Sequence, residues 1–432
     1  MKRLLSLMLA LLCLLAHPAQ ALAAEPSAPS AESSVSSLST EIDRSQYVDG
    51  SAWENPPPDV GKIRVGLRYS YTAVVQAILN NPTGGAFDVG WYDDNLNFYP
   101  VERIYCSSVL IALADDEENG LMVLDAGTLE VLFLTFASRW IVVVPAEGEA
   151  LGVTEYEGHQ YHGGFMFLDA GFDLLTVVNV VDLETYVKGV VPYEMNRKFP
   201  VEALKAQAVA ARTYVVYNMG AYSIYGFDLS DTAECQVYGG ILAADEVTDG
   251  AVDATRGLLI RYRGEIADIY YSAADGGSTE DGFNVFNTDA PYLCGKRDPF
   301  EDTIDYPLKS WEVRYDGETI AGLLRDQWNL RTGKIREVEP VYSENDNVIA
   351  LNYTGSDGKV YHTEGRVCYT ALGLNSAHFT VEKDSDGTFV FRGGGLGHNC
   401  GMSQWGAYAM AENFGLNYED ILRFYYTGVY IA

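Results

Sequence analysis

Glu194 is the side chain of this 432-residue sequence best placed for acid–base chemistry. It follows Val190, Val191 and Pro192 and precedes Met195, so its carboxyl group stands among apolar residues. Apolar surroundings favour the neutral form of a carboxyl, which a general acid working near neutral pH requires. A solvated loop glutamate without a catalytic role is the alternative that these residues alone leave open.

Two glycine-containing segments are further candidates for a site. Arg392–Gly406 gathers one His, one Cys and a Gln-Trp pair among glycines, and its His398 could orient a catalytic carboxylate or contact a substrate. A hydrolase with Cys400 as the nucleophile is a weaker interpretation, because a nucleophile and its base usually meet through the fold. Ser272–Glu280 could let the backbone approach a ligand closely, although an ordinary loop would have the same composition.

Metal binding is not favoured by the sequence. Cys235, His398 and Cys400 could form one set of ligands, and His159 with His162 another. Neither set has the spacing of a closed zinc site. We therefore expect no metal and no other cofactor.

The elements around Glu194 follow from the local pattern. The β-branched run Val177–Val181 predicts a strand, and we interpret 184–195 as a strand that runs into a turn. An Ala-rich helix is predicted over 201–219, since it opens just after Pro200 and closes before Gly220.

Arg212 falls in the apolar stripe of this helix. A buried and unpaired guanidinium costs several kcal/mol, so Arg212 needs a carboxylate or several carbonyl groups as partners. A structural ion pair and a role in substrate binding both remain open. Gln207 and Tyr214 share another face of the helix.

Strand and helix patterns are mixed without strict alternation, which predicts an α+β fold. Residues 310–390 have mainly β patterning, and Arg263-Gly264 is a plausible hairpin turn. The other predicted strands are Lys62–Arg68, Leu258–Tyr262 and Ile266–Ser272, and the other predicted helices are 245–255, 403–414 and 418–426.

The N-terminus predicts export. Lys2-Arg3, the apolar run Leu4–Leu15 and Ala21-Leu22-Ala23 form the three parts of a cleaved secretory signal. We expect a protein that is secreted or held in the cell wall, without a stable membrane anchor after cleavage. The predicted parts are a signal peptide over 1–23, a disordered Ser/Ala/Pro linker over 24–60, a β-rich domain over 61–160 and a mixed α+β catalytic domain over 161–432.

Charge and cysteine content limit the partners. The net charge of −31 lacks the basic surface of a nucleic-acid binder and argues against an anionic membrane surface. An odd number of cysteines remains after cleavage, so at least one stays free, binds a metal or pairs between chains. These cysteines are Cys106, Cys235, Cys294, Cys368 and Cys400.

Taken together, the motifs of residues 161–432 resemble those of the stage II sporulation protein D and amidase-enhancer family. Ile63–Leu67 also matches the usual opening of that family. The stretches that carry the resemblance are Leu183–Met195, Ala203–Tyr214, Cys235–Gly240, Ala251–Gly257, Ser272–Glu280, Pro291–Leu293, Gly395–Ala407 and Tyr418–Tyr426.

The resemblance implies a peptidoglycan lytic transglycosylase that acts on glycan strands, particularly strands whose stem peptides an amidase has removed. A cell-wall amidase is the further partner that it implies. Glu194 falls on the catalytic glutamate of the family. The candidates for holding the sugar and this glutamate are Gln207, Arg212, Tyr214, Gln236, Tyr238, Ser272, His398, Ser403 and Gln404.

This chain departs from the family pattern at two places. Asp275 stands where the family usually has Ser, and Gly397-His-Asn-Cys-Gly401 replaces the usual Gly-His-Gly-Val-Gly. Both departures lie where substrate handling is expected, so the activity could be altered. Some relatives carry a Cys/His zinc site, but no compact Cys/His cluster surrounds Cys235, and the metal is not carried over.

Two other functions remain open. The chain could be a non-catalytic glycan-binding protein that enhances an amidase. It could also be a true hydrolase in which Asp228, Asp231 or Asp275 assists Glu194.

Overall fold

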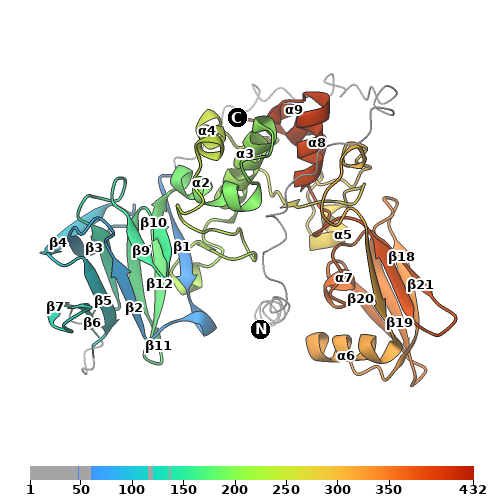
Figure 1. The fold of residues 1–432 in the computed structure, drawn as a ribbon, viewed down its shortest axis with the longest axis horizontal. Coiled ribbons are helices and arrows are strands. Elements are labelled where there is room, and N and C mark those ends of the chain that lie inside the picture. The colour runs from blue at the N-terminus through green and yellow to red at the C-terminus, as the bar shows by residue number, and fades with distance from the viewer. Residues whose placement is uncertain (1–46, 48–59, 115–119, 136–137) are drawn as a thin grey trace. The chain divides into compact units, whose positions relative to one another are not determined.

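The computed structural model describes residue 47 and residues 60–114, 120–135 and 138–432. The predicted signal peptide over 1–23 and nearly all of the predicted linker over 24–60 lie outside these residues. Both strands and helices build the described chain, which confirms the α+β fold class (Figure 1). None of the described helices combines the length and the apolar character that a membrane span requires.

The chain divides into two compact units. Among the described residues, the sheet unit comprises residues 60–197 and 211–259, and the C-terminal unit comprises residues 198–210 and 260–432 together with Tyr47. This division differs from the predicted boundary near residue 160. The physical reason is that the segment after this boundary supplies central strands to the same sheet as the segment before it.

The sheet unit contains a seven-stranded and a six-stranded sheet (Figure 1). In spatial order the first has β13 (Leu229–Ser230), β1 (Lys62–Arg68), β12 (Leu174–Asp182), β11 (Gly164–Gly171), β8 (Trp140–Pro145), β3 (Phe87–Tyr92) and β4 (Phe98–Ile104). The second has β10 (His159–Tyr161), β9 (Thr154–Tyr156), β2 (Gln76–Asn80), β5 (Ser108–Leu113), β6 (Leu121–Asp125) and β7 (Val131–Leu134).

The predicted strands β1 and β12 pair in antiparallel fashion, with Ile63 opposite Val181 and Val65 opposite Asn179. Every residue of β12 from Leu175 to Val181 is buried, as expected for a central strand with both faces covered. β12 leads directly into helix α2 and therefore fixes where that helix begins.

Helix α2 (Leu183–Glu194) corrects the prediction of a strand and a turn over 184–195. Asp182 caps it by accepting a hydrogen bond from the Thr185 amide at 3.1 Å, a strong start signal. Val190 and Val191 are fully buried in this helix, so packing outweighs their β preference. Pro192 lies within the last turn.

The other helices near the predicted site agree with the sequence to within a residue or two. Helix α3 spans Val201–Asn218 and α4 spans Glu246–Ala254. Helix α8 spans Gln404–Phe414 and α9 spans Tyr418–Tyr425. The start of α3 belongs to the C-terminal unit and the remainder to the sheet unit.

The C-terminal unit contains four small sheets. They are β15 (Glu265–Ile266), β14 (Ile260–Tyr262) and β24 (Tyr430–Ile431); β16 (Tyr271–Ser272) and β23 (Met402–Ser403); β17 (Trp311–Tyr315), β22 (Phe389–Gly393) and β21 (Phe379–Lys383); and β18 (Ile335–Tyr342), β19 (Val348–Gly355) and β20 (Val360–Glu364). Its remaining helices are α5 (Gly282–Phe286), α6 (Gly317–Trp328) and α7 (Val367–Thr370). Short 3-10 helices occur at Ser70–Thr72, Ser223–Tyr225 and Glu301–Thr303.

The predicted hairpin is present, since Arg263 and Gly264 both have positive φ between β14 and β15. The predicted strand over 266–272 is shorter than expected and splits between β15 and β16. Helix α6 interrupts the region predicted as β, with Asp316 accepting from the Thr319 amide at 2.8 Å as its cap.

Candidate functional site

Glu194 is the last residue of α2, and its side chain is half-buried. The next residue, Met195, is fully buried and donates its amide to the Val191 carbonyl at 2.8 Å. The C-terminal end of a helix is the negative end of its dipole, which disfavours an ionised carboxylate there. A proton-donating glutamate is therefore consistent with this position.

Buried aromatic contacts hold α2 in place from one side. The Tyr186 and Tyr238 rings pack with their centroids 4.7 Å apart, and the Tyr186 hydroxyl donates to Gln236 Oε1 at 3.2 Å. Gln236 Nε2 donates to the Ala211 carbonyl at 3.2 Å, and the Tyr238 hydroxyl donates to Asn179 Oδ1 at 2.9 Å. The Gln236 amide and the Tyr238 hydroxyl are thus hydrogen-bonded inside the protein, where they help to position α2.

Two glycines allow the segment after Tyr238 to lie directly on α2. A Cβ atom at Gly189 would stand 2.5 Å from the Tyr238 ring, and one at Gly239 would stand 2.1 Å from the Tyr193 ring. The residue before Glu194 is therefore packed against the backbone of Gly239. This close approach fixes the end of the helix that carries the glutamate.

Arg212 is fully buried and forms an ion pair with Glu184 in the first turn of α2, with both contacts at 2.7 Å. Its guanidinium also donates to the carbonyls of Leu258 at 3.2 Å and Val252 at 3.4 Å. Of the two roles that the sequence leaves open, these contacts show the structural ion pair. Arg212 joins α2, α3 and α4 inside the sheet unit.

In the C-terminal unit, the strands β16 and β23 bring two of the predicted residues together. They pair in parallel with Ser272 opposite Ser403. Ser403 is buried and caps α8, because its Oγ accepts from the Gly406 amide at 3.0 Å. A Cβ at Gly397 would stand 2.6 Å from Ser272 Cβ, so the glycine-rich segment passes directly over Ser272.

His398 lies in an aromatic surrounding, with the Phe286 ring 4.9 Å and the Tyr270 ring 6.2 Å away. Burial, together with the nearby Arg366 charge, lowers the pKa of His398 to about 3, so the imidazole is neutral. Its Nδ1 accepts the Cys400 amide at 3.1 Å.

Cys400 does not fit the role of a nucleophile. Its side chain is fully buried, and burial raises the pKa of the thiol well above its usual value, which disfavours the reactive thiolate. His398 Nδ1 faces the backbone amide of Cys400. The five cysteines of the described chain are free thiols.

The predicted residues of α3 belong to different units. Gln207 is fully buried in the C-terminal unit, and its Oε1 accepts from Gln404 Nε2 at 3.4 Å. Among the described residues Gln207 Nε2 has no hydrogen-bond partner, so this buried donor could serve a bound molecule. Tyr214 belongs to the sheet unit and is half-buried.

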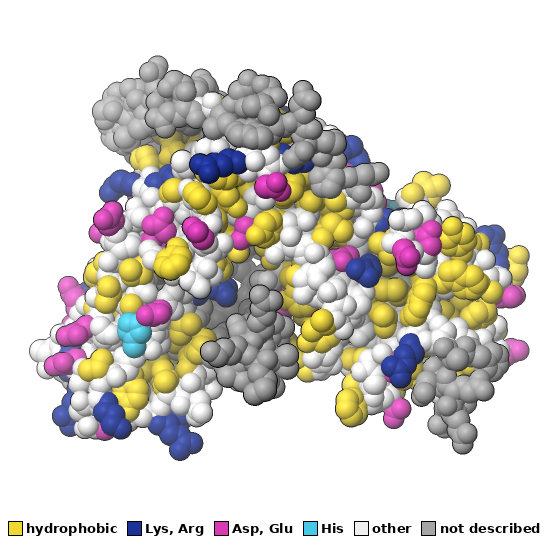
Figure 2. Space-filling model, turned by 180° about the vertical axis from the view of Figure 1, so that it is seen from behind, with side chains coloured by type: hydrophobic (Ala, Val, Ile, Leu, Met, Phe, Trp, Pro, Cys, Tyr) yellow, Lys and Arg dark blue, Asp and Glu magenta, His cyan; other side chains and the backbone are white. Residues whose placement is uncertain are grey.

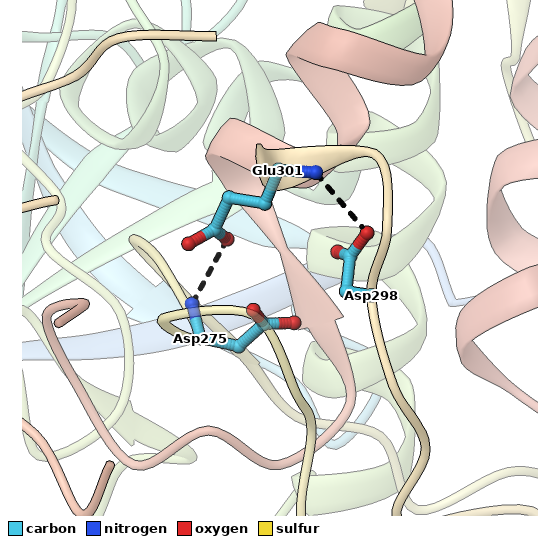
Figure 3. Close-up of side chains that lie close together, drawn as sticks. All are labelled: Asp275, Asp298 and Glu301. Atoms are coloured by element: carbon cyan, nitrogen blue, oxygen red, sulfur yellow. Dashed lines mark hydrogen bonds between the residues drawn. The ribbon is translucent and has the colours of Figure 1, made fainter. Parts of the chain in front are cut away.

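A cluster of buried acids lies beside Ser403, which contacts one of them, Glu301. Carboxylate oxygens of Asp275, Asp298 and Glu301 lie within 4.8 Å of one another, and among the described residues this is the one set of three His, Cys, Asp or Glu side chains so close together. Figure 3 shows the Asp275 amide donating to Glu301 and the Glu301 amide donating to Asp298. Ser403 Oγ also donates to Glu301, at 2.5 Å.

Hydrogen bonds satisfy Glu301 in this cluster, whereas Asp275 Oδ2 has no hydrogen-bond partner among the described residues. Each Glu301 oxygen accepts a backbone amide and a hydroxyl, the hydroxyls coming from Tyr306 and Ser403. Burial and the neighbouring carboxylates hold the pKa of Asp275 well above its usual range, and burial raises that of Asp298 to about 6. The raised pKa favours the neutral form of Asp275, and the contacts of Glu301 tie the cluster to the loop that carries Ser403.

The aspartates of the hydrolase alternative have different surroundings. Asp228 is buried and pairs with Arg64 through contacts of 2.8 and 3.2 Å, and Asp275 belongs to the acid cluster. Among the described residues, Asp231 forms no ion pair like that of Asp228 with Arg64. Burial raises its pKa to about 7, against the opposing charge of Arg68.

Asp231 predicts a pH dependence of stability. The folded side chain holds its proton up to about pH 7, whereas an unperturbed aspartate loses it near 3.8, so its contribution to the free energy of unfolding should fall as pH rises between these values. Asp231→Asn stays neutral. We expect it to match the wild type near pH 4 and to be more stable by about 4 kcal/mol near pH 8, as measured by urea unfolding.

Asp94→Asn is the matched control, because Asp94 is exposed in the same unit. It should give the same small difference from the wild type at both pH values. An Asp231→Asn variant that is no more stable than the wild type near pH 8 would show that Asp231 is solvated.

The sequence did not single out Asp298 and Glu301 as residues near the site. They lie in the loop before and within the 3-10 helix Glu301–Thr303, and only the fold brings them to Asp275. The sequence around these two residues is a weak sign of a site, because a proline between two acidic residues is common in loops. On the face drawn in Figure 2, Lys and Arg side chains are scattered among Asp and Glu.

Comparison with known proteins matches the segment that carries Glu194. The family model described as "Stage II sporulation protein" matches residues 173–262. Stage II sporulation protein D of Bacillus subtilis is 31% identical over 272 residues, which cover 59% of this chain and 76% of that protein.

Two further relatives extend the comparison. An uncharacterised protein of Brachyspira hyodysenteriae is 34% identical over 289 residues, covering 64% of this chain and 73% of its own length. The amidase enhancer of Bacillus subtilis is 30% identical over 287 residues, covering 56% of this chain but 39% of that protein. By these matches, the chain belongs to the stage II sporulation protein D family.

Proposed function

We propose that this protein is an exported lytic transglycosylase that cleaves the glycan strands of the bacterial cell wall. The observation that carries the proposal is the position of Glu194, half-buried at the C-terminal end of a helix that Tyr186, Gly189 and Tyr193 pack firmly in place. The substrate bond is the β-1,4 link from N-acetylmuramic acid to N-acetylglucosamine.

One carboxyl group is sufficient for this reaction. Protonated Glu194 gives its proton to the glycosidic oxygen as the bond from that oxygen to C1 breaks and oxocarbenium character develops. The carboxylate then takes the proton of the sugar's own 6-hydroxyl, whose oxygen bonds to C1 and closes a 1,6-anhydro ring. Glu194 regains its proton, and no water is consumed, so a second carboxylate is not required.

A non-catalytic enhancer of a cell-wall amidase is the second candidate, and the similarity to an amidase enhancer supports it. Of the three aspartates of the hydrolase alternative, Asp228 and Asp275 already have partners inside the protein, which leaves Asp231 as the candidate to assist Glu194. In either case the partners that we propose are glycan strands and an amidase that strips them of peptides.

Product analysis separates the three functions. Purified, peptide-stripped glycan is digested with the wild type and with Glu194→Gln, and the products are weighed by mass spectrometry. We expect 1,6-anhydro ends from the wild type and none from the variant. Reducing ends would indicate the hydrolase, and no product from either protein would indicate the enhancer.

A further inference from the structure

A cavity of about 740 Å³ lies within the C-terminal unit, apart from Glu194 in the sequence. Its walls are residues 283–287 of and after α5, Ile349 and Ala350 of β19, and residues 364–367 at the start of α7. Figure 1 shows α5 and α7 next to each other. The volume is in the range of cavities that bind small molecules or sugar units.

The backbone around this cavity is tightly built. Gly365 has a φ of 55°, and a Cβ there would stand 3.0 Å from the Asn284 carbonyl oxygen. Its amide donates to the Ile349 carbonyl at 2.9 Å. The loop that carries Arg366 is therefore held against α5 at a fixed distance.

Arg366 presents a positive charge at the cavity. Its guanidinium lies over the Phe286 ring, 4.9 Å from the centroid, and Phe286 in turn stacks on Tyr270 at 4.0 Å. In the described part of the chain this guanidinium forms no ion pair and donates no hydrogen bond. A ring contact occupies only the face of a guanidinium. The edge with its N–H groups can therefore form a bidentate pair of hydrogen bonds with a planar anion.

The other groups of the cavity suit a sugar that carries a carboxylate. Phe283 is 64% exposed and offers a flat apolar surface beside Arg366 for the face of a pyranose ring. Glu364, the one carboxylate among the lining residues, forms a hydrogen bond with His362 Nε2 at 2.8 Å.

We propose that this cavity binds an N-acetylmuramic acid unit of a peptide-stripped strand, with Arg366 pairing with the lactyl carboxylate. The inference rests on the proposed function and adds a site that recognises the substrate. In intact peptidoglycan the lactyl group is amide-linked to the stem peptide, so its carboxylate exists only after an amidase has acted. Arg366 thus gives a chemical reason for a preference for stripped strands.

The test compares two glycans with and without the lactyl group. The full chain, carrying Glu194→Gln to prevent turnover, is titrated calorimetrically with peptide-stripped glycan oligomers and with N-acetylglucosamine oligomers of equal length. We expect the stripped glycan to bind about tenfold more tightly, the usual size of a charge-assisted hydrogen-bond contribution. Arg366→Gln should remove this preference and leave binding of the N-acetylglucosamine oligomers unchanged.

Three further variants sharpen the result. Arg366→Lys keeps the charge but cannot form the bidentate contact, so it should retain part of the preference for stripped glycan. Phe283→Ala should weaken binding of both oligomers alike, whereas Arg331→Gln, which removes an exposed arginine outside the cavity, should change neither. Melting temperatures equal to the parent's would show that the variants fold.

The inference is overturned if Arg366→Gln binds stripped glycan as tightly as the parent, or if the parent binds both oligomers equally. Either result leaves the proposed function intact when the protein with its native Glu194 still forms 1,6-anhydro ends. Absence of those ends contradicts the proposed function alone, since calorimetry can still show a lactyl-dependent binding site.

Discussion

Replacing Glu194 by Gln should lower the rate of glycan cleavage by about a hundred- to ten-thousand-fold, because glutamine can neither donate nor accept the proton. The amide has nearly the same shape as the carboxyl group, so the end of α2 should remain packed against Gly239. The measurement is the initial rate of soluble product release from peptide-stripped glycan, with the melting temperature recorded for each protein.

Glu246→Gln is the matched control for this prediction, because Glu246 is an exposed glutamate of α4 in the same unit. It should cleave glycan at the wild-type rate. A Glu194→Gln variant that retains most of the wild-type rate would remove Glu194 from the catalytic role and leave another residue to be found.

The second large effect concerns stability. Arg212→Met leaves the buried Glu184 carboxylate without its cation and should lower the free energy of unfolding by about 3 to 5 kcal/mol in urea titrations. Removing both charges, in Glu184→Met with Arg212→Met, should recover most of this loss, because no unpaired charge then remains buried. Lys188→Met breaks the more exposed pair between Lys188 of α2 and Asp253 of α4 and should cost about 1 kcal/mol or less.

The double variant also decides between the two roles of Arg212. If it regains stability and cleaves glycan normally, Arg212 serves only to join α2, α3 and α4. Recovered stability with weakened glycan binding would instead favour the substrate-binding role that the sequence left open.

The elements that follow strong local signals could be predicted from the sequence. Pro200 and Gly220 delimit α3 to within two residues, and the β-branched run before Asp182 becomes the buried strand β12. Helix α2 could not be predicted in the same way. Its Val190-Val191-Pro192 run resembles the end of a strand, and it is helical because Asp182 caps it and its valines are buried.

The candidate site was predicted in part. Glu194 lies at a helix end, as a residue accessible for chemistry requires, but Gln236 and Tyr238 face into the protein and hold α2. A sequence motif shows that such residues matter without showing which way their side chains point. The acid cluster and the Arg366 cavity are formed by loops that are far apart in the chain. No spacing of residues in the sequence therefore predicts them.

Asp275 illustrates how a departure from a family pattern can be accommodated. A buried carboxyl at this position would be costly if ionised, and the neighbouring Glu301 and Asp298 raise its pKa so that the neutral form is favoured. Its Oδ1 accepts the Gly277 amide at 2.8 Å and so closes the turn of its own loop. The Asp275 side chain therefore supports its own loop.

Cleavage of stripped glycan in water labelled with heavy oxygen tests the central claim most directly. The account predicts products whose new muramic acid ends carry no label and are lighter by one water than reducing ends, with Glu194→Gln yielding none. Heavy oxygen at C1 of those ends would mean that water is the nucleophile, and the proposal that Glu194 alone directs an internal ring closure would then be wrong.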